Sequence, residues 1–191
     1  MDRIHRKRLV FADEKLLKGC EMFSRKGRAD DNGNLPPLVV IPDYSNTYCI
    51  MGLLHCNRKK DAAYLAFSIG EENHDSFCFR EFISVSVASG VLEEGDILVV
   101  DNASIHVSGE NDDLDEFLWE EFSILMIRLP TYSPELNPIE LIWNLVVMRM
   151  QSFTLENNMD VQYNTRELAI CVMKKISRKD VKKAYTRCGY M

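Results

Sequence analysis

Long apolar runs and paired cysteines are both missing from this sequence of 191 residues. No apolar run approaches the ~20 residues that a helix needs to cross a bilayer, so we expect no transmembrane segment and no membrane partner. The N-terminal stretch MDRIHRKRLVF is basic but too poor in apolar residues for a signal peptide. The six cysteines include no C-x-x-C pair, which disfavours a zinc cluster and favours free thiols in a reducing compartment. The sequence therefore predicts an intracellular protein.

A net positive charge is missing too, since the formal charge is −6, and this argues at first against a nucleic-acid partner. The distribution of charge is uneven, however. Residues 1–28 carry a net +5 and residues 174–191 a net +6, which leaves −17 on residues 29–173. Basic ends with an acidic centre suit a protein that contacts phosphates at its edges and holds cations in its middle. Two solvated charged termini explain the same pattern equally well.

Hydrophobic periodicity predicts the element order β-β-β-α-β-α-β-α-α. Three antiparallel strands followed by two parallel strands, with helices on the faces, make an α/β mixed sheet. No repeat, low-complexity tract or linker divides the chain. We therefore expect one domain, 1–191, whose C-terminal helical part spans about 137–191. The predicted strands are 8–13, 47–55, 62–70, 97–100 and 124–130, and the predicted helices are 74–94, 110–122, about 137–153 and about 160–185.

Three acids stand where predicted elements end or begin. Asp13 closes the first strand, Asp101 closes the fourth, and Glu140 opens a helix. Ligands of open α/β sheets bind at the carboxyl ends of strands, so Asp13 and Asp101 would lie side by side if these strands are neighbours. Converging carboxylates repel one another, and Mg²⁺ or Mn²⁺ relieves that repulsion. Two such ions, roughly 3.5–4 Å apart, suit the cleavage of a phosphodiester.

These acids also have plain structural interpretations. An Asp after a strand is most often a turn residue or a helix cap. Asn137, Pro138 and Glu140 occupy the N-cap, N1 and N3 positions of the predicted helix, which makes Glu140 the acid of a capping box. The apolar stripe that includes Ile139 and Trp143 buries one face of that helix, and Glu140 lies beside it. From this pattern alone, capping is slightly favoured over chemistry.

Two longer motifs change that balance. DNASIH (101–106) and LPTYSPELNPIELIW (129–143) resemble the catalytic core of the mariner-type transposases of the DDE superfamily. In that family an Asp opens a D-N-A-x-x-H element, and the third acid lies in L-P-x-Y-S-P-x-L-N-P-I-E-x-x-W. Here 38 residues separate the two acids, somewhat more than the commonest family spacings. The resemblance also reaches LVFADE (9–14) and CGY (188–190).

The resemblance implies an RNase H-like fold with Asp13, Asp101 and Glu140 as catalytic residues that hold two Mg²⁺ or Mn²⁺ ions. The implied activity is cleavage and joining of DNA, with transposon ends and target DNA as partners and a homodimer as a compatible assembly. The implied location is the nucleus in a eukaryote and the cytoplasm or nucleoid otherwise. Glu14, adjacent to Asp13, is the alternative first acid. Thr131 stands where many family members have proline.

Several other residues have open assignments. Asn102 either fixes the turn after the fourth strand or contacts substrate. His106 either approaches the scissile phosphate or is a hydrogen-bonded structural residue. Tyr132 shapes its loop or contacts a phosphate, and Trp143 reads as a core anchor. Six basic residues near the C-terminus either follow a DNA backbone or solvate a helix: Lys174, Lys175, Arg178, Lys179, Lys182 and Lys183.

Members of this family also carry an N-terminal helix-turn-helix region that reads the transposon ends. Barely a dozen residues precede Asp13 here, so we expect no such domain within this sequence. Two other functions therefore stay open. One is a catalytically inactive or domesticated remnant that binds DNA or a partner protein, and the other is an RNase H-like nuclease that cleaves RNA–DNA hybrids.

Overall fold

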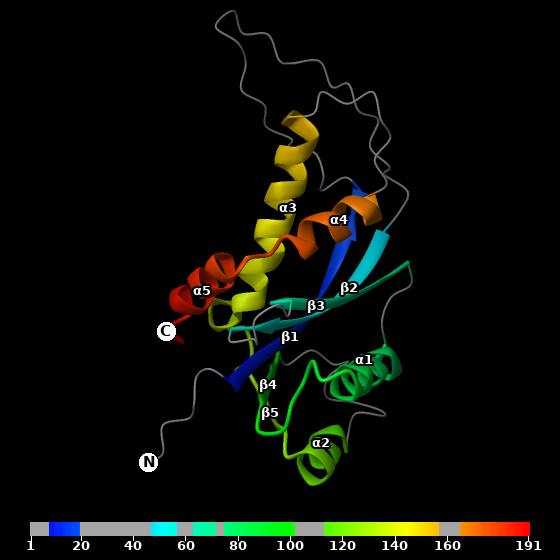
Figure 1. The fold of residues 1–191 in the computed structure, drawn as a ribbon, viewed down its shortest axis with the longest axis vertical. Coiled ribbons are helices and arrows are strands. Elements are labelled where there is room, and N and C mark those ends of the chain that lie inside the picture. The colour runs from blue at the N-terminus through cyan, green and yellow to red at the C-terminus, as the bar shows by residue number, and fades with distance from the viewer. Residues whose placement is uncertain (1–7, 20–46, 57–62, 72–74, 102–112, 157–164) are drawn as a thin grey trace, which may run out of the picture.

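A five-stranded mixed sheet forms the centre of the computed structural model, which describes residues 8–19, 47–56, 63–71, 75–101, 113–156 and 165–191 (Figure 1). The spatial order of the strands is β3-β2-β1-β4-β5. β1 pairs antiparallel with β2 and β2 with β3, whereas β4 and β5 continue the sheet in parallel with β1. This confirms the predicted RNase H-like mixed sheet. The strands are β1 (Leu9–Lys18), β2 (Thr47–His55), β3 (Leu65–Gly70), β4 (Ile97–Val100) and β5 (Leu125–Arg128).

The described helices are α1 (Ser76–Ala88), α2 (Leu114–Phe122), α3 (Pro138–Glu156), α4 (Thr165–Lys174) and α5 (Arg178–Arg187). The prediction of one helix over about 160–185 is wrong, because the helical structure is interrupted between α4 and α5. A capping box restarts the helix there: the Ser177 hydroxyl accepts from the Asp180 N–H, and the Asp180 carboxylate accepts from the Ser177 N–H. None of the described helices is long and apolar enough to cross a membrane.

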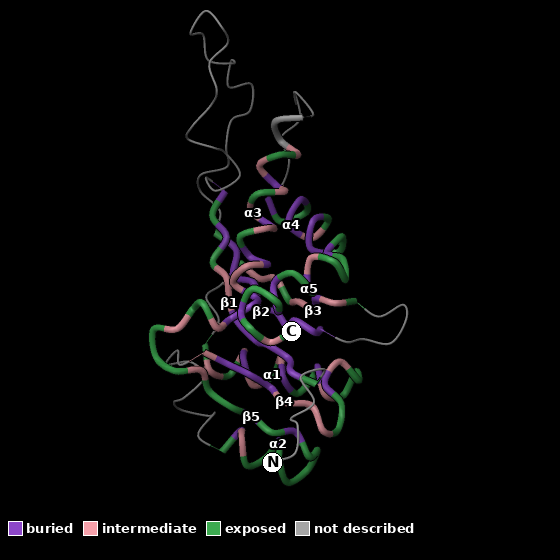
Figure 2. Tube along the Cα trace, turned by 90° about the vertical axis from the view of Figure 1, so that its left-hand side faces the viewer, coloured by how far each residue is buried: buried purple, intermediate pink, exposed green. Residues whose placement is uncertain are grey.

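The helices cover the two faces of the sheet in separate groups (Figures 1 and 2). Helices α3, α4 and α5 pack on one face, where the core includes Phe11, Leu54 and Trp143. Helices α1 and α2 pack on the other, where the core includes Val10 and Leu98. Strand β4 is buried on both faces, which explains its continuous apolar run ILVV.

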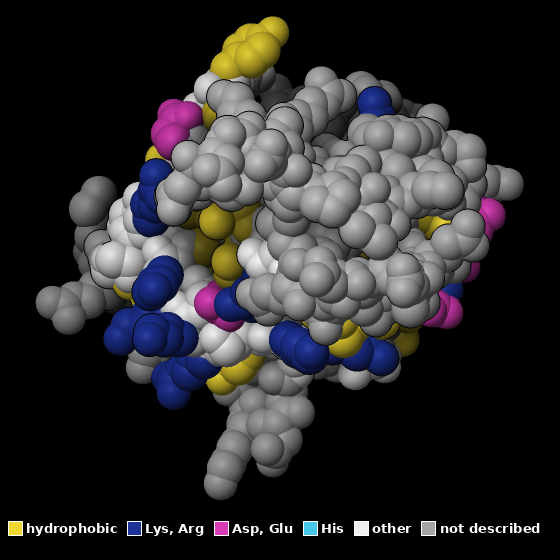
Figure 3. Space-filling view, turned by 90° about the horizontal axis from the view of Figure 1, so that it is seen from above, with side chains coloured by type: hydrophobic (Ala, Val, Ile, Leu, Met, Phe, Trp, Pro, Cys, Tyr) yellow, Lys and Arg dark blue, Asp and Glu magenta, His cyan; other side chains and the backbone are white. Residues whose placement is uncertain are grey.

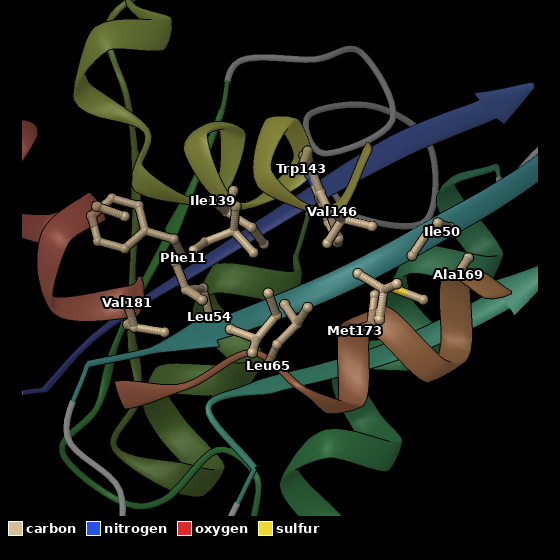
Figure 4. Packing of buried hydrophobic residues seen from close by; sticks show 14 of the residues in the cluster. Phe11, Ile50, Leu54, Leu65, Ile139, Trp143, Val146, Ala169, Met173 and Val181 are labelled. Carbon is tan, nitrogen blue, oxygen red and sulfur yellow. The ribbon is translucent and has the colours of Figure 1, made fainter. Parts of the chain in front are cut away.

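Helix α3 is anchored on the sheet by its apolar stripe. Ile139, Trp143 and Val146 point from α3 toward β1 and β2 (Figure 4) and are almost fully buried. Each large apolar side chain buried in this way contributes about 1.5–3 kcal/mol. The packing fixes the rotation of α3 and therefore the direction in which its first turn presents Glu140.

Strand β1 continues past the point where the sequence pattern predicts its end. Asp13 is predicted to close the strand, but β1 runs on to Lys18, paired with β2 throughout. The charged stretch Asp13–Lys15 hides this continuation in the sequence, although Leu17 behind it is buried. Asp13 therefore stands in the middle of a strand.

The C-terminal end of the described chain packs against the start of β1. The buried Tyr185 hydroxyl lies 2.9 Å from both the Leu9 and the Leu54 carbonyl oxygens. The Tyr190 hydroxyl donates to the Leu136 carbonyl at 2.8 Å, and the Phe11 ring contacts both tyrosines. Tyr190, which follows α5, thus holds the segment that leads into α3. The five cysteines in the described ranges are free thiols, as predicted for them.

Candidate active site

Strand β4 stops beside Asp13 while β1 continues. The last pair between the two strands joins Ala12 to Val100, so Asp101 follows at the level of Asp13. This confirms the expected neighbourhood of these two acids. They lie where the sheet narrows, because from Asp13 onward β1 has a partner only on its β2 side among the described strands.

Strand geometry separates Asp13 from Glu14. Successive side chains of a strand point to opposite faces. Phe11 and Leu17 belong to the core under α3, whereas Ala12 belongs to the opposite core. Asp13 therefore faces α3 and Glu14 faces away, so Asp13 is the acid of this pair that faces the helix carrying Glu140.

Asp13 is buried, with 6% of its surface exposed, and has one direct side-chain partner on α3. The indole Nε1 of Trp143 donates a hydrogen bond to Asp13 Oδ2 at 3.2 Å. The sequence interpretation of Trp143 as a core anchor is thus incomplete, because the ring also touches the first acid. Nothing local in the sequence signals this contact, which spans 130 positions.

The capping box predicted for Glu140 is not formed. The Asn137 N–H donates to the Pro134 carbonyl in a short 3₁₀ helix, Pro134–Leu136, rather than to the Glu140 carboxylate. Asn137 is buried, and its Oδ1 has no hydrogen-bond partner, so it does not cap the N–H of Glu140. The Glu140 N–H instead bonds to the Asn137 carbonyl. The structural interpretation of Glu140 as a capping acid is therefore wrong.

Asp101 and Glu140 line one cavity of about 380 Å³. The loop from Leu129 to Pro134 and the Asn137 side chain form the rest of its lining. Within this loop Tyr132 has a φ of +57° and is 98% exposed. A left-handed backbone at a non-glycine residue is unfavourable and is commonly found at functional sites.

Burial and neighbouring charge perturb the acids. Burial, together with the charges of Glu140 and Asp101, raises the pKa of Asp13 to about 8, and burial has the largest effect. Burial also raises the pKa of Glu140; the Lys15 ammonium opposes this rise and Asp101 reinforces it. The acids thus have a basic neighbour in Lys15, whose charge acts on Glu140. Because Asp101 raises the pKa of both Asp13 and Glu140, the three carboxylates lie close enough to interact electrostatically.

The donor chemistry of this cluster fits a hard divalent cation. Asp101 raises the pKa of both Asp13 and Glu140, and a positive ion among such carboxylates relieves their repulsion. The orphaned Asn137 Oδ1 lies in the same region and is a further hard oxygen. Within the described ranges, however, no three Asp, Glu, His or Cys side chains are already close enough to hold an ion. Metal binding at this place would draw the acids closer together.

The six basic residues singled out near the C-terminus are all exposed, at the end of α4, in the turn after it and along α5. Lys179, Lys182 and Lys183 line a shallow hollow together with Arg187, which the sequence pattern does not single out. Seen from above, Lys and Arg side chains gather on one side of the molecule (Figure 3). Asn102 and His106 lie outside the described residues.

The sheet order and the helices on its two faces define an RNase H-like domain. The sequence profile of the family described as "DDE superfamily endonuclease" matches residues 8–162. The chain therefore belongs to the DDE superfamily endonuclease family. None of the curated proteins matches it by sequence.

Solved structures of similar fold include several of the Mos1 mariner transposase. The Mos1 paired-end complex with Mn shares 14% identity and a TM-score of 0.69, over 98% of this chain and 54% of that one. The Mos1 catalytic domain shares 11% identity and a TM-score of 0.61, over 96% of this chain and 78% of that one. The paired-end complex with Mg gives 14% identity and a TM-score of 0.59, over 96% and 54%. This chain thus spans about half the length of the Mos1 chains in the paired-end complexes.

Proposed function

We propose that this chain is the catalytic part of a mariner-type transposase, which cuts and joins DNA phosphodiesters with two Mg²⁺ or Mn²⁺ ions. The observation that carries the proposal is the gathering of Asp13, Asp101 and Glu140 from two strands and a helix of an RNase H-like sheet. Membership of the DDE superfamily endonuclease family supports the same chemistry.

Each acid has a distinct place in the proposed mechanism. Asp101 and Glu140 line the cavity, and in this mechanism they would face the scissile phosphate. Asp13 lies buried against α3 and supplies its carboxylate from within the fold. The bound ions would supply Lewis-acid stabilisation of the attacking and leaving oxygens. The protein's part is to orient its carboxylates around the ions, whose positive charge would favour the deprotonated form of Asp13.

Two exposed features of the surface would bind the substrate. Exposed Lys and Arg side chains of α4 and α5 would contact the DNA backbone. Tyr132, almost fully exposed at the rim of the acid-lined cavity, offers an aromatic face to an unstacked base. Mos1 is described in complexes with transposon ends. We propose transposon-end and target DNA as substrates here, with a homodimer as the assembly that pairs two ends.

Plasmid nicking tests the catalytic proposal. The parent chain should convert supercoiled plasmid to nicked circles in Mn²⁺, and Asp101→Asn or Glu140→Gln should reduce the rate by at least 10²-fold, because each removes a charge that holds the ions. Glu135→Gln is the matched control, since this exposed acid lies in the same loop but outside the lining of the cavity. Cleavage that persists in both active-site variants would refute the mechanism.

Calorimetric titration with Mn²⁺ separates the enzyme from a non-catalytic remnant. An enzyme of this kind should bind Mn²⁺ with a dissociation constant below the millimolar range, and Glu140→Gln should weaken that binding. A remnant that acts only by contacting DNA or protein would bind none at millimolar Mn²⁺. The measurement needs no DNA, so it does not depend on end recognition.

The salt dependence of DNA binding tests the basic surface. Changing Lys179, Lys182 and Lys183 to Ala should reduce the slope of log K against log salt by about 0.9 for each duplex phosphate that the protein then leaves unneutralised. Replacing the same three residues with Arg keeps the charge and should leave the slope unchanged. An unaltered slope in the Ala variant would show that DNA binds to another surface of the protein.

A further inference from the structure

We propose that Trp143 is a positioning residue for the Asp13 carboxylate, and that Gly52 is present to give the indole ring room to reach it. This inference rests on the proposed metal-dependent function and assigns a role to two residues that carry no charge. It concerns the orientation of the buried acid, which the three-acid motif alone does not explain.

The hydrogen bond between the two side chains is the first observation. Trp143 is 1% exposed, and its Nε1 lies 3.2 Å from Asp13 Oδ2. An indole N–H is a donor only, and a buried one needs an acceptor. A phenylalanine would also be apolar and aromatic, although smaller, and would have no such requirement. The nitrogen of Trp143 therefore adds a directional contact to a buried acid that has Glu140 and Asp101 as charged neighbours.

The second observation concerns the strand on the other side of Asp13. Gly52 of β2 pairs directly with Asp13 of β1. A Cβ at position 52 would lie 2.5 Å from Trp143 Cη2, 2.8 Å from Cζ2 and 3.2 Å from Ile139 Cδ1. The two nearest atoms belong to a rigid buried ring, so they have no flexible end that could move aside. Any larger residue would push the indole away from its present place against β1 and β2 (Figure 4).

A glycine in the interior of a strand is unfavourable unless something must approach the backbone closely. Here the approaching group is the ring that donates to Asp13. Gly52, Trp143 and Asp13 thus form one unit: the glycine admits the ring, the ring fixes one carboxylate oxygen, and the carboxylate keeps its remaining lone pairs for a cation. Hydrogen bonds of this kind to a ligating carboxylate typically change metal affinity by 10–100-fold.

Metal affinity measured together with stability tests the proposal. Trp143→Phe removes the N–H and part of the ring volume, and it should weaken Mn²⁺ binding by about 10-fold in calorimetry while the circular dichroism spectrum stays unchanged. Val146→Ala is the control, because it makes a cavity in the same helix and the same core without touching Asp13. It should lower the melting temperature and leave the Mn²⁺ dissociation constant as in the parent.

Gly52→Ala tests the same unit with all its polar groups present. It should also weaken Mn²⁺ binding by about 10-fold, and it answers the question even if Trp143→Phe does not fold. A third measurement uses fluorescence. The chain has two tryptophans, so Trp119→Phe, at an exposed position of α2, leaves Trp143 as the only tryptophan, which excitation near the red edge of the absorption band observes selectively. Mg²⁺ should then shift its emission along the same binding curve as calorimetry.

The outcomes separate this inference from the proposed function. Parent-like Mn²⁺ affinity in Trp143→Phe or Gly52→Ala, or a Trp143 emission that ignores Mg²⁺, would overturn the positioning role and leave the enzyme intact. A parent chain that binds no Mn²⁺ would refute the proposed function, and the role of Trp143 with it.

Discussion

Replacing Asp13 with Asn should stabilise the metal-free protein and abolish its metal binding. The pKa of the buried Asp13 is raised to about 8 from its ordinary value of 3.8, so between these values the folded chain holds a proton that the unfolded chain releases. The stability that this proton contributes is complete below pH 3.8 and is lost as the pH rises toward 8. The amide of the Asp13→Asn variant does not titrate, so the free energy of unfolding of the variant lacks this dependence on pH.

The size of the effect follows from the shift. Each pKa unit corresponds to about 1.4 kcal/mol, so by pH 7 the parent has lost about 4 kcal/mol relative to acid conditions. Burying the new amide costs about 1–3 kcal/mol. The Asn side chain still offers an oxygen to Trp143. The net gain of Asp13→Asn at pH 7 is therefore about 1–3 kcal/mol, and it should grow by about 1.4 kcal/mol for each pH unit between 5 and 7.

Urea unfolding in EDTA at pH 5, 6 and 7 measures this difference. Other groups with shifted pKa values, such as Glu140 and Asp180, are present in both proteins, so their contributions to the pH dependence cancel in the comparison. Val146→Ala, which removes no ionisable group, is the control and should show no such trend. A stability difference that does not change with pH would refute the reasoning. In Mn²⁺ at 100 times its dissociation constant the parent should gain about 2.7 kcal/mol, and Asp13→Asn should gain nothing.

Three other changes have defined outcomes. Tyr185→Phe should lower the free energy of unfolding by about 1–3 kcal/mol in urea, because two buried carbonyls lose the single hydroxyl proton that they share. Ser177→Ala should lower it by about 1 kcal/mol by removing the cap of α5, and parent-like stability would show that the cap is unimportant. Tyr132→Gly should raise stability by about 1 kcal/mol by relieving the positive φ, yet weaken single-stranded DNA binding by about 10-fold in fluorescence anisotropy. Unchanged DNA affinity would remove Tyr132 from the binding surface.

Local patterns in the sequence predict most of the fold. The run ILVV of β4 and the apolar stripe of α3 are continuous signals, and both elements form as expected. The extension of β1 is not visible, because pairing with β2 overrides the polar stretch Asp13–Lys15. The break between α4 and α5 is not predicted, because helical periodicity alone does not distinguish the capping box at Ser177 from the interior of one long helix.

The candidate site divides in the same way. Sequence motifs mark Asp101 and Glu140, and in the structure both residues line one cavity. The contact of Asp13 with Trp143 and the space made by Gly52 depend on tertiary packing over distances that no local pattern encodes. The capping box at Asn137 fails for a related reason: the preceding 3₁₀ helix takes up the N–H that the motif assigned to Glu140.

The Tyr185 hydroxyl has a consequence for how the chain folds during synthesis. It meets the Leu9 carbonyl across 176 positions, so the strand made first receives its covering helix last. Until α5 has emerged, the side chains of β1 on that face, Leu9 and Phe11 among them, lack part of their cover. Contacts of such long sequence separation slow folding and prolong the exposure of apolar surface. Ribosome-bound intermediates that lack α5 are therefore the species in which this domain should be most dependent on chaperones.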